Sequence, residues 1–223
     1  MNELVFFMQI IVVFLATFLA LRYGKTALAL LACLQTLLAN LFVLKQVHLF
    51  GWEVTCSDAF AIGVVLNLNL LQEYFGKPAA QKAGKLCLYS MVFFALVSLL
   101  HLAYIPSHND SMNSSYQRLL LPAPRLLFAS LFTFFIVQKA DLLVFSKLKT
   151  KCSSFLAKNL YSLLSSQLLD TILFTFLGLY GLVASCFDVL LLSYLVKVAI
   201  IFSLSPLTHL FQKWIPLPRP YRS

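Results

Sequence analysis

Long apolar runs, separated by short polar or basic breaks, fill almost the whole chain of 223 residues. Each run is close to the ~20 residues that a helix needs to cross about 30 Å of hydrocarbon. The runs are continuously apolar rather than alternating, which favours helices, because a helix satisfies its own backbone hydrogen bonds within lipid. We therefore predict an all-α polytopic transmembrane helical bundle, with spans near residues 4–21, 26–44, 54–72, 86–105, 125–146, 160–182 and 187–209.

The predicted spans divide the chain into three parts. Residues 1–25 form an extra N-terminal transmembrane span, which we expect to be retained because its start, Met1-Asn2-Glu3, lacks the basic residues of a cleaved signal. Residues 26–212 form a six-span core, interrupted by one long polar break at residues 106–124. Residues 213–223 form a proline-rich cytoplasmic tail.

The charge distribution indicates how these spans are oriented. The chain is 61% hydrophobic and 11% charged, and its formal net charge is +9. With seven spans, most lysines and arginines fall in loops on one side, which is the basic bias of cytoplasmic loops. We therefore expect an integral cell-membrane protein with its N-terminus outside and its C-terminus in the cytoplasm. The basic residues indicate topology and contact with the lipid bilayer rather than nucleic-acid binding.

Motifs for nucleotide hydrolysis and metal binding are missing from the sequence. The five cysteines and four histidines are scattered, so we predict no disulfide framework, no zinc site and no cofactor. We do not expect an enzyme. A membrane enzyme with Asp141 and Asp170 as paired acids remains an alternative, although no nucleophile–base pair accompanies them.

Polar groups inside the predicted spans are the strongest indication of function. A charge at bilayer depth costs roughly 2.5–3.5 kcal/mol on insertion scales, so it persists mainly where it lines a pathway or has a partner. Two spans each carry an aromatic ring, an amide and a carboxylate on one helix face: Phe134, Gln138 and Asp141 in the first, and Phe174, Gln167 and Asp170 in the second. A carboxylate accepts paired N–H donors and a ring stacks on a planar base, so these groups suit a flat, purine-like heterocycle.

An ion pair is expected at a similar depth. Asp170 lies roughly 18 Å along its helix from Lys158, and Lys197 roughly 14 Å from Asp188, at about 1.5 Å per residue. Both side chains therefore lie near the bilayer midplane and can pair. Lys197 could balance a substrate-binding carboxylate, act as a gate or serve only to specify the fold.

Further polar side chains occur in the second and third predicted spans. Asn40 and Asn69 are candidate substrate ligands, and Glu73, at the inner boundary, is a candidate gating residue. Asp58 lies near the outer end of its span, where water can solvate it, and we do not include it among the binding residues.

Short sequence blocks in a fixed order carry a family resemblance. These blocks are Ala39-Asn-Leu-Phe-Val-Leu-Lys45, Leu68-Asn-Leu-Leu-Gln-Glu-Tyr-Phe-Gly-Lys77, Arg125 with Ala129-Ser130 and Gln138-x-x-Asp141, Ser165-Ser-Gln-Leu-Leu-Asp-Thr171 with Phe174, and Tyr194-x-x-Lys197. Together they resemble the queuosine precursor transporter family of vitamin-uptake-like integral membrane proteins. The resemblance covers residues 26–212.

This resemblance implies uptake of a 7-deazaguanine precursor of queuosine (preQ0, preQ1 or the queuine base) into the cytoplasm, for salvage in tRNA modification. It also implies a location in the bacterial inner membrane. Asp170 and Asp141 would then face the N–H donors of the base, with amides as further partners. Asn69 stands where the family usually has an aspartate, so the precursor or the coupling could differ.

Two other interpretations remain open besides the enzyme. The chain could be a substrate-capture subunit for another small vitamin-like heterocycle, working with a separate energising complex. It could also be a structural membrane subunit in which Asp170 and Lys197 only specify the fold. The sequence leaves the oligomeric state and any energising partner undetermined.

Overall fold

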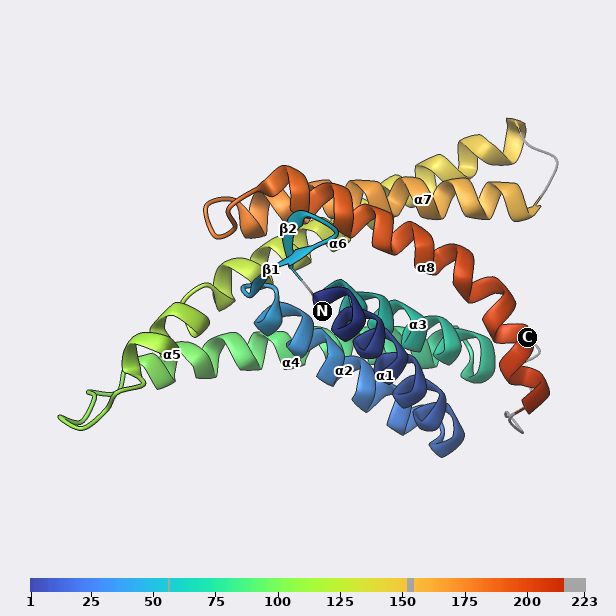
Figure 1. The fold of residues 1–223 in the computed structure, drawn as a ribbon. Coiled ribbons are helices and arrows are strands. Elements are labelled where there is room, and N and C mark those ends of the chain that lie inside the picture. Colours follow the sequence, from blue (N-terminus) through green and yellow to red (C-terminus); the bar gives the residue numbers. More distant parts are fainter. Residues whose placement is uncertain (56, 152–154, 215–223) are drawn as a thin grey trace.

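Nearly all of the described chain is helical (Figure 1). The computed structural model describes residues 1–55, 57–151 and 155–214, and excludes the side chains at 73, 138–139, 141–151, 155–160, 162–163, 200–201 and 203–214. The helices are α1 (Asn2–Tyr23), α2 (Lys25–Phe42), α3 (Asp58–Phe75), α4 (Lys77–Leu102), α5 (Asn113–Leu120), α6 (Ala123–Lys151), α7 (Phe155–Phe174), the π-helical turn η1 (Thr175–Leu179) and α8 (Cys186–Trp214). The helical architecture predicted from the apolar runs is confirmed.

The helices form two groups (Figure 1). In the first, α1 to α4 pack against one another around buried side chains that include Phe18, Leu28 and Leu71. In the second, α7 packs against both α6 and α8. The groups meet where α4 contacts α6 and where α3 contacts α8, and Val43 after α2 packs with Leu126 of α6.

Four helical stretches in the described part are long and apolar enough to cross a membrane. They are Asn2–Tyr23, Lys25–Phe42, Lys77–Leu102 and Asn113–Val137, and shorter apolar stretches occur at Asp58–Gln72 and Leu164–Leu179. Large apolar side chains on these helices are exposed, as is expected of surfaces that face lipid rather than water. The count of seven spans and the division at residues 25 and 212 stay predictions, and residues 215–223 of the predicted tail lie outside the described residues.

A β-hairpin between α2 and α3 was not predicted. Strands β1 (Gln46–Leu49) and β2 (Trp52–Thr55) pair antiparallel, and Phe50 and Gly51 between them both have positive φ, at 52° and 84°. Two such residues are typical of the tight turn that matches the twist of a hairpin. The predicted third span began too early, at residue 54, because the apolar residues of β2 were read as part of the helix.

A close helix contact holds α3 against α1 and α2. A Cβ atom at Gly63 would lie 2.5 Å from Oε1 of Gln35 and 2.7 Å from a methyl group of Val13. The same Gln35 oxygen accepts a 2.8 Å hydrogen bond from Nδ2 of Asn67, whose side chain is fully buried. The absent side chain at residue 63 thus permits an interhelical hydrogen bond that positions α3, which carries part of the site described next.

Candidate binding site

A cavity of about 640 Å³ lies between the two helix groups. Residues of α2, α3, α6, α7, η1 and α8 line it, together with the end of the hairpin. Small-molecule sites commonly have volumes of roughly 300–1,000 Å³. The lining brings together seven of the residues proposed from the sequence, namely Asn40, Asn69, Phe134, Gln167, Asp170, Phe174 and Lys197.

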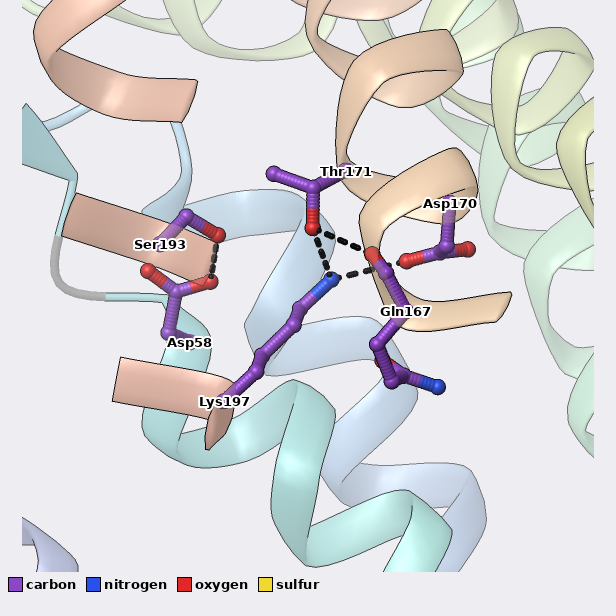
Figure 2. A network of polar contacts seen from close by, with 6 residues as sticks. All are labelled: Asp58, Gln167, Asp170, Thr171, Ser193 and Lys197. Carbon is purple, nitrogen blue, oxygen red and sulfur yellow. Dashed lines mark hydrogen bonds and ion pairs between the residues drawn. The ribbon is translucent and has the colours of Figure 1, made fainter. Parts of the chain in front are cut away.

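The ion pair expected between Asp170 and Lys197 is present (Figure 2). The Lys197 ammonium, on α8, donates to Asp170 Oδ2 at 2.7 Å and to Thr171 Oγ1 at 3.1 Å. The hydroxyl of Thr171 donates in turn to the backbone oxygen of Gln167 at 2.8 Å. The Lys197 side chain is only 9% exposed, whereas that of Asp170 is 35% exposed. The lysine is therefore enclosed, and the carboxylate keeps accessible surface in the cavity wall.

A second carboxylate, Asp58 at the start of α3, also lines the cavity. Its Oδ1 accepts a 2.6 Å hydrogen bond from the hydroxyl of Ser193, one helical turn before Lys197 on α8 (Figure 2). The site predicted from the sequence does not include Asp58, because the predicted span puts this residue near its outer end, where water can solvate it. The hairpin before α3 shifts the start of the helix to this residue, and α8 crosses beside it. The sequence feature that could have indicated a role for Asp58 is an acidic residue inside an apolar segment.

The amide side chains differ in how far they are already engaged. Asn40 donates through Nδ2 to the backbone oxygen of Thr36 at 2.9 Å and contacts the sulfur of Met91 at 3.0 Å. Its Oδ1 accepts from the Ser130 hydroxyl at 3.4 Å. Asn69 is exposed and lies on the cavity wall. Asn40 therefore helps to shape the wall, and Asn69 has more freedom to contact a ligand.

The two predicted stacking rings also differ in their environment. Phe134 of α6 is 53% exposed and makes an edge-on contact with Phe135, with ring centroids 5.9 Å apart. Phe174, at the end of α7, packs against the apolar cluster that contains Leu126 and Leu179. The Phe134 ring consequently has the larger free face for a planar ligand.

Three further residues of the predicted site belong to α3 and α6. The side chains of Gln138 and Asp141 on α6 and of Glu73 on α3 lie outside the described residues. Their roles as substrate ligands or as a gate stay predictions. Among the side chains that are described, no group of three or more His, Cys, Asp or Glu residues is arranged to hold a metal ion.

The hairpin is attached to the second helix group beside the cavity. Gln46 of β1 accepts a 2.7 Å hydrogen bond from the backbone N–H of Ala184 and donates to the backbone oxygen of Leu182 at 3.3 Å. Both partners belong to the connection between η1 and α8. Thr55 of β2 lines the cavity. The hairpin therefore links the two helix groups at this end of the cavity.

Comparison with known proteins identifies the class. Residues 57–211 match the sequence model of a family described as "Putative vitamin uptake transporter". The match covers more than half of the chain, and the chain belongs to this family of membrane transport proteins. It is also 28% identical, over 87% of either chain, to a Bacillus subtilis (strain 168) protein named "Probable queuosine precursor transporter". The family resemblance found in the sequence is confirmed. No solved structure matches the chain.

Proposed function

We propose that this chain takes up a 7-deazaguanine precursor of queuosine and binds it in the cavity between the two helix groups. The observation that carries the proposal is that one cavity of suitable volume brings a carboxylate, amides and an accessible ring onto its wall. The name of the Bacillus subtilis relative supports the choice of substrate. A guanine-like edge presents N–H donors, which a carboxylate can accept in pairs.

In this proposal, five residues of the cavity wall have assigned roles in binding. Asp170 accepts the paired N–H donors of the base through Oδ1 and the remaining acceptor position of Oδ2, and Lys197 supplies the counter-charge within the membrane. Gln167 and Asn69 contact the remaining polar edge, and Phe134 stacks on the ring plane. Asp141 and Gln138, on the same helix as Phe134, extend this set.

The proposed topology assigns one end of the cavity to the outside of the cell. The N-terminus is outside and the C-terminus is in the cytoplasm, so the end of the cavity beside the hairpin faces outward. Uptake then requires a second conformation of similar free energy in which the inner end opens.

Thermal unfolding of the purified protein with a panel of deazapurines tests the proposal. A ligand that binds only the folded protein raises its stability by RT ln(1 + [L]/Kd), about 2.7 kcal/mol at a hundred times Kd. We expect 7-deazaguanines to raise the unfolding temperature and 7-deazaadenine, which lacks the guanine edge, to leave it unchanged. Asp170→Ala should abolish the increase. A folded Asp170→Ala protein with unaltered affinity would remove Asp170 from the site, and no response to any deazaguanine would refute the proposed substrate.

Reconstitution into vesicles separates a complete transporter from a substrate-capture subunit. We expect the chain alone to accumulate labelled precursor inside vesicles. Binding without uptake would instead identify a capture subunit that requires an energising complex.

A further inference from the structure

The described part of the cavity wall contains more carboxylates than cationic side chains. Three charged side chains are present among the described residues of its lining: Asp58, Asp170 and Lys197. With both carboxylates ionised, two negative charges face one positive charge. In that state the described wall has one carboxylate more than it has cations, in a region where an unbalanced charge is costly.

Lys197, the one lysine among the described lining residues, pairs with Asp170. Its ammonium lies 2.7 Å from Oδ2 of Asp170 and 3.1 Å from the hydroxyl of Thr171, both on α7. Figure 2 shows the ammonium directed toward these two partners, with Asp58 on the other side next to Ser193. Lys197 therefore contacts the α7 carboxylate directly, whereas it acts on the α3 carboxylate only across a longer distance.

The hydrogen-bond partner of Asp58 is an uncharged hydroxyl group. It accepts one hydrogen bond, at 2.6 Å from the hydroxyl of Ser193, and takes part in neither of the ion pairs found in the described part of the chain. An ionised carboxylate offers about four acceptor positions on its two oxygens. Asp58 therefore retains the capacity to accept charged N–H donors from a molecule in the cavity.

We propose that Asp58 binds a positively charged amine of the substrate, so that the cavity selects an aminomethyl deazaguanine over its uncharged nitrile counterpart. This inference rests on the proposed function and adds a second contact. The guanine-like edge meets Asp170 on α7, and the ammonium substituent meets Asp58 on α3. The substrate thus supplies the positive charge that the cavity wall lacks, and a charge-assisted hydrogen bond forms only with the cationic ligand.

Binding of two matched ligands to the purified full chain at pH 7 tests the inference. The ligands, 7-aminomethyl-7-deazaguanine and 7-cyano-7-deazaguanine, share one ring and differ in the charge of the substituent. We expect the aminomethyl ligand to bind at least about tenfold more tightly to the wild-type protein, as one charge-assisted hydrogen bond allows. Asp58→Asn should remove this preference by weakening aminomethyl binding at least about tenfold more than nitrile binding.

Two further variants serve as controls. Asp188→Asn removes a carboxylate at the start of α8 that does not line the cavity, and should keep the preference. Asp58→Glu retains the charge and should retain much of the preference.

The inference is overturned if the wild-type protein binds the nitrile ligand as tightly as, or more tightly than, the aminomethyl ligand. This comparison needs no variant, so it stands even if Asp58→Asn does not fold. A folded Asp58→Asn protein that keeps the preference overturns it as well. In each of these cases a ligand still binds, so the proposed function stands. If the wild-type protein binds neither ligand, the proposed function itself is refuted.

Discussion

The Asp170–Lys197 pair shows how individual residues combine stability with a binding role. The ammonium is enclosed and bonded to two side chains, whereas the carboxylate is half-buried on the cavity wall. Removal of one partner from a buried pair leaves the other charge uncompensated, which costs more than removal of both. The stability of single and double variants therefore reports on the pair, and ligand binding reports on Asp170.

Lys197→Met should lower the free energy of unfolding by on the order of 3 kcal/mol, because Asp170 loses its counter-charge. The double variant Asp170→Asn with Lys197→Met should recover most of this loss but should not bind a deazaguanine. Unfolding in detergent, monitored with and without ligand, measures both effects. Lys85→Met, at an exposed position of α4, is the matched control and should change neither. A double variant that still binds with wild-type affinity would support the purely structural interpretation of the pair.

At the scale of the elements, a side chain of α6 forms hydrogen bonds with the π-helical turn η1 that follows α7. Arg125 donates through Nε to the backbone oxygen of Leu177 at 3.0 Å and through a terminal nitrogen to that of Tyr180 at 2.6 Å. These carbonyls belong to the π-helical turn η1 and its C-terminal boundary, where backbone oxygens lack intrahelical partners. The arginine of the family-like sequence block thus acts here as a helix cap between two elements.

Arg125→Lys should destabilise the protein by about 1–2 kcal/mol, because an ammonium cannot reproduce the two divergent donors of a guanidinium. Amide hydrogen exchange should rise most at residues 177–183. Arg118→Lys, an exposed change on α5, provides the control. Equal exchange in the two variants would show that the cap contributes nothing to the end of α7.

For the whole molecule, the charge pattern predicts a single orientation in the membrane. The polar connection between α4 and α5 contains Asp110, which accepts hydrogen bonds from the backbone N–H groups of Met112 and Asn113. The opposite end of α4 begins with Lys77. The proposed topology places Asp110 outside and Lys77 in the cytoplasm.

Labelling of single cysteines tests this orientation in intact cells. In a chain whose five native cysteines are replaced by alanine, Asp110→Cys should react with a membrane-impermeant maleimide. Lys77→Cys should react only after the membrane is permeabilised. The reverse pattern would invert the topology, and external labelling of both positions would show that α4 does not cross the membrane.

Much of the fold followed from local sequence properties. The apolar runs predicted the helices, because any helix within lipid needs about 20 apolar residues whatever its neighbours are. The hairpin was missed because its alternation covers only two strands of four residues each, at the edge of an apolar run. The stripe of Gln167, Asp170 and Phe174 could be predicted as one helix face, because helical periodicity alone determines which residues share a face, and all three line the cavity.

By itself, the sequence determined the helical membrane class and the polar face of α7, which depend on residues close together in the chain. It also determined the family, through short blocks in a fixed order along the chain. Only the tertiary structure decided that Asp58 belongs to the cavity, because its partner Ser193 is 135 residues away. It also decided that Asn40 is engaged with Met91 while Asn69 is free to face a ligand. The physical reason is that helix crossings and the hairpin bring these side chains together, and no local periodicity encodes which helices cross.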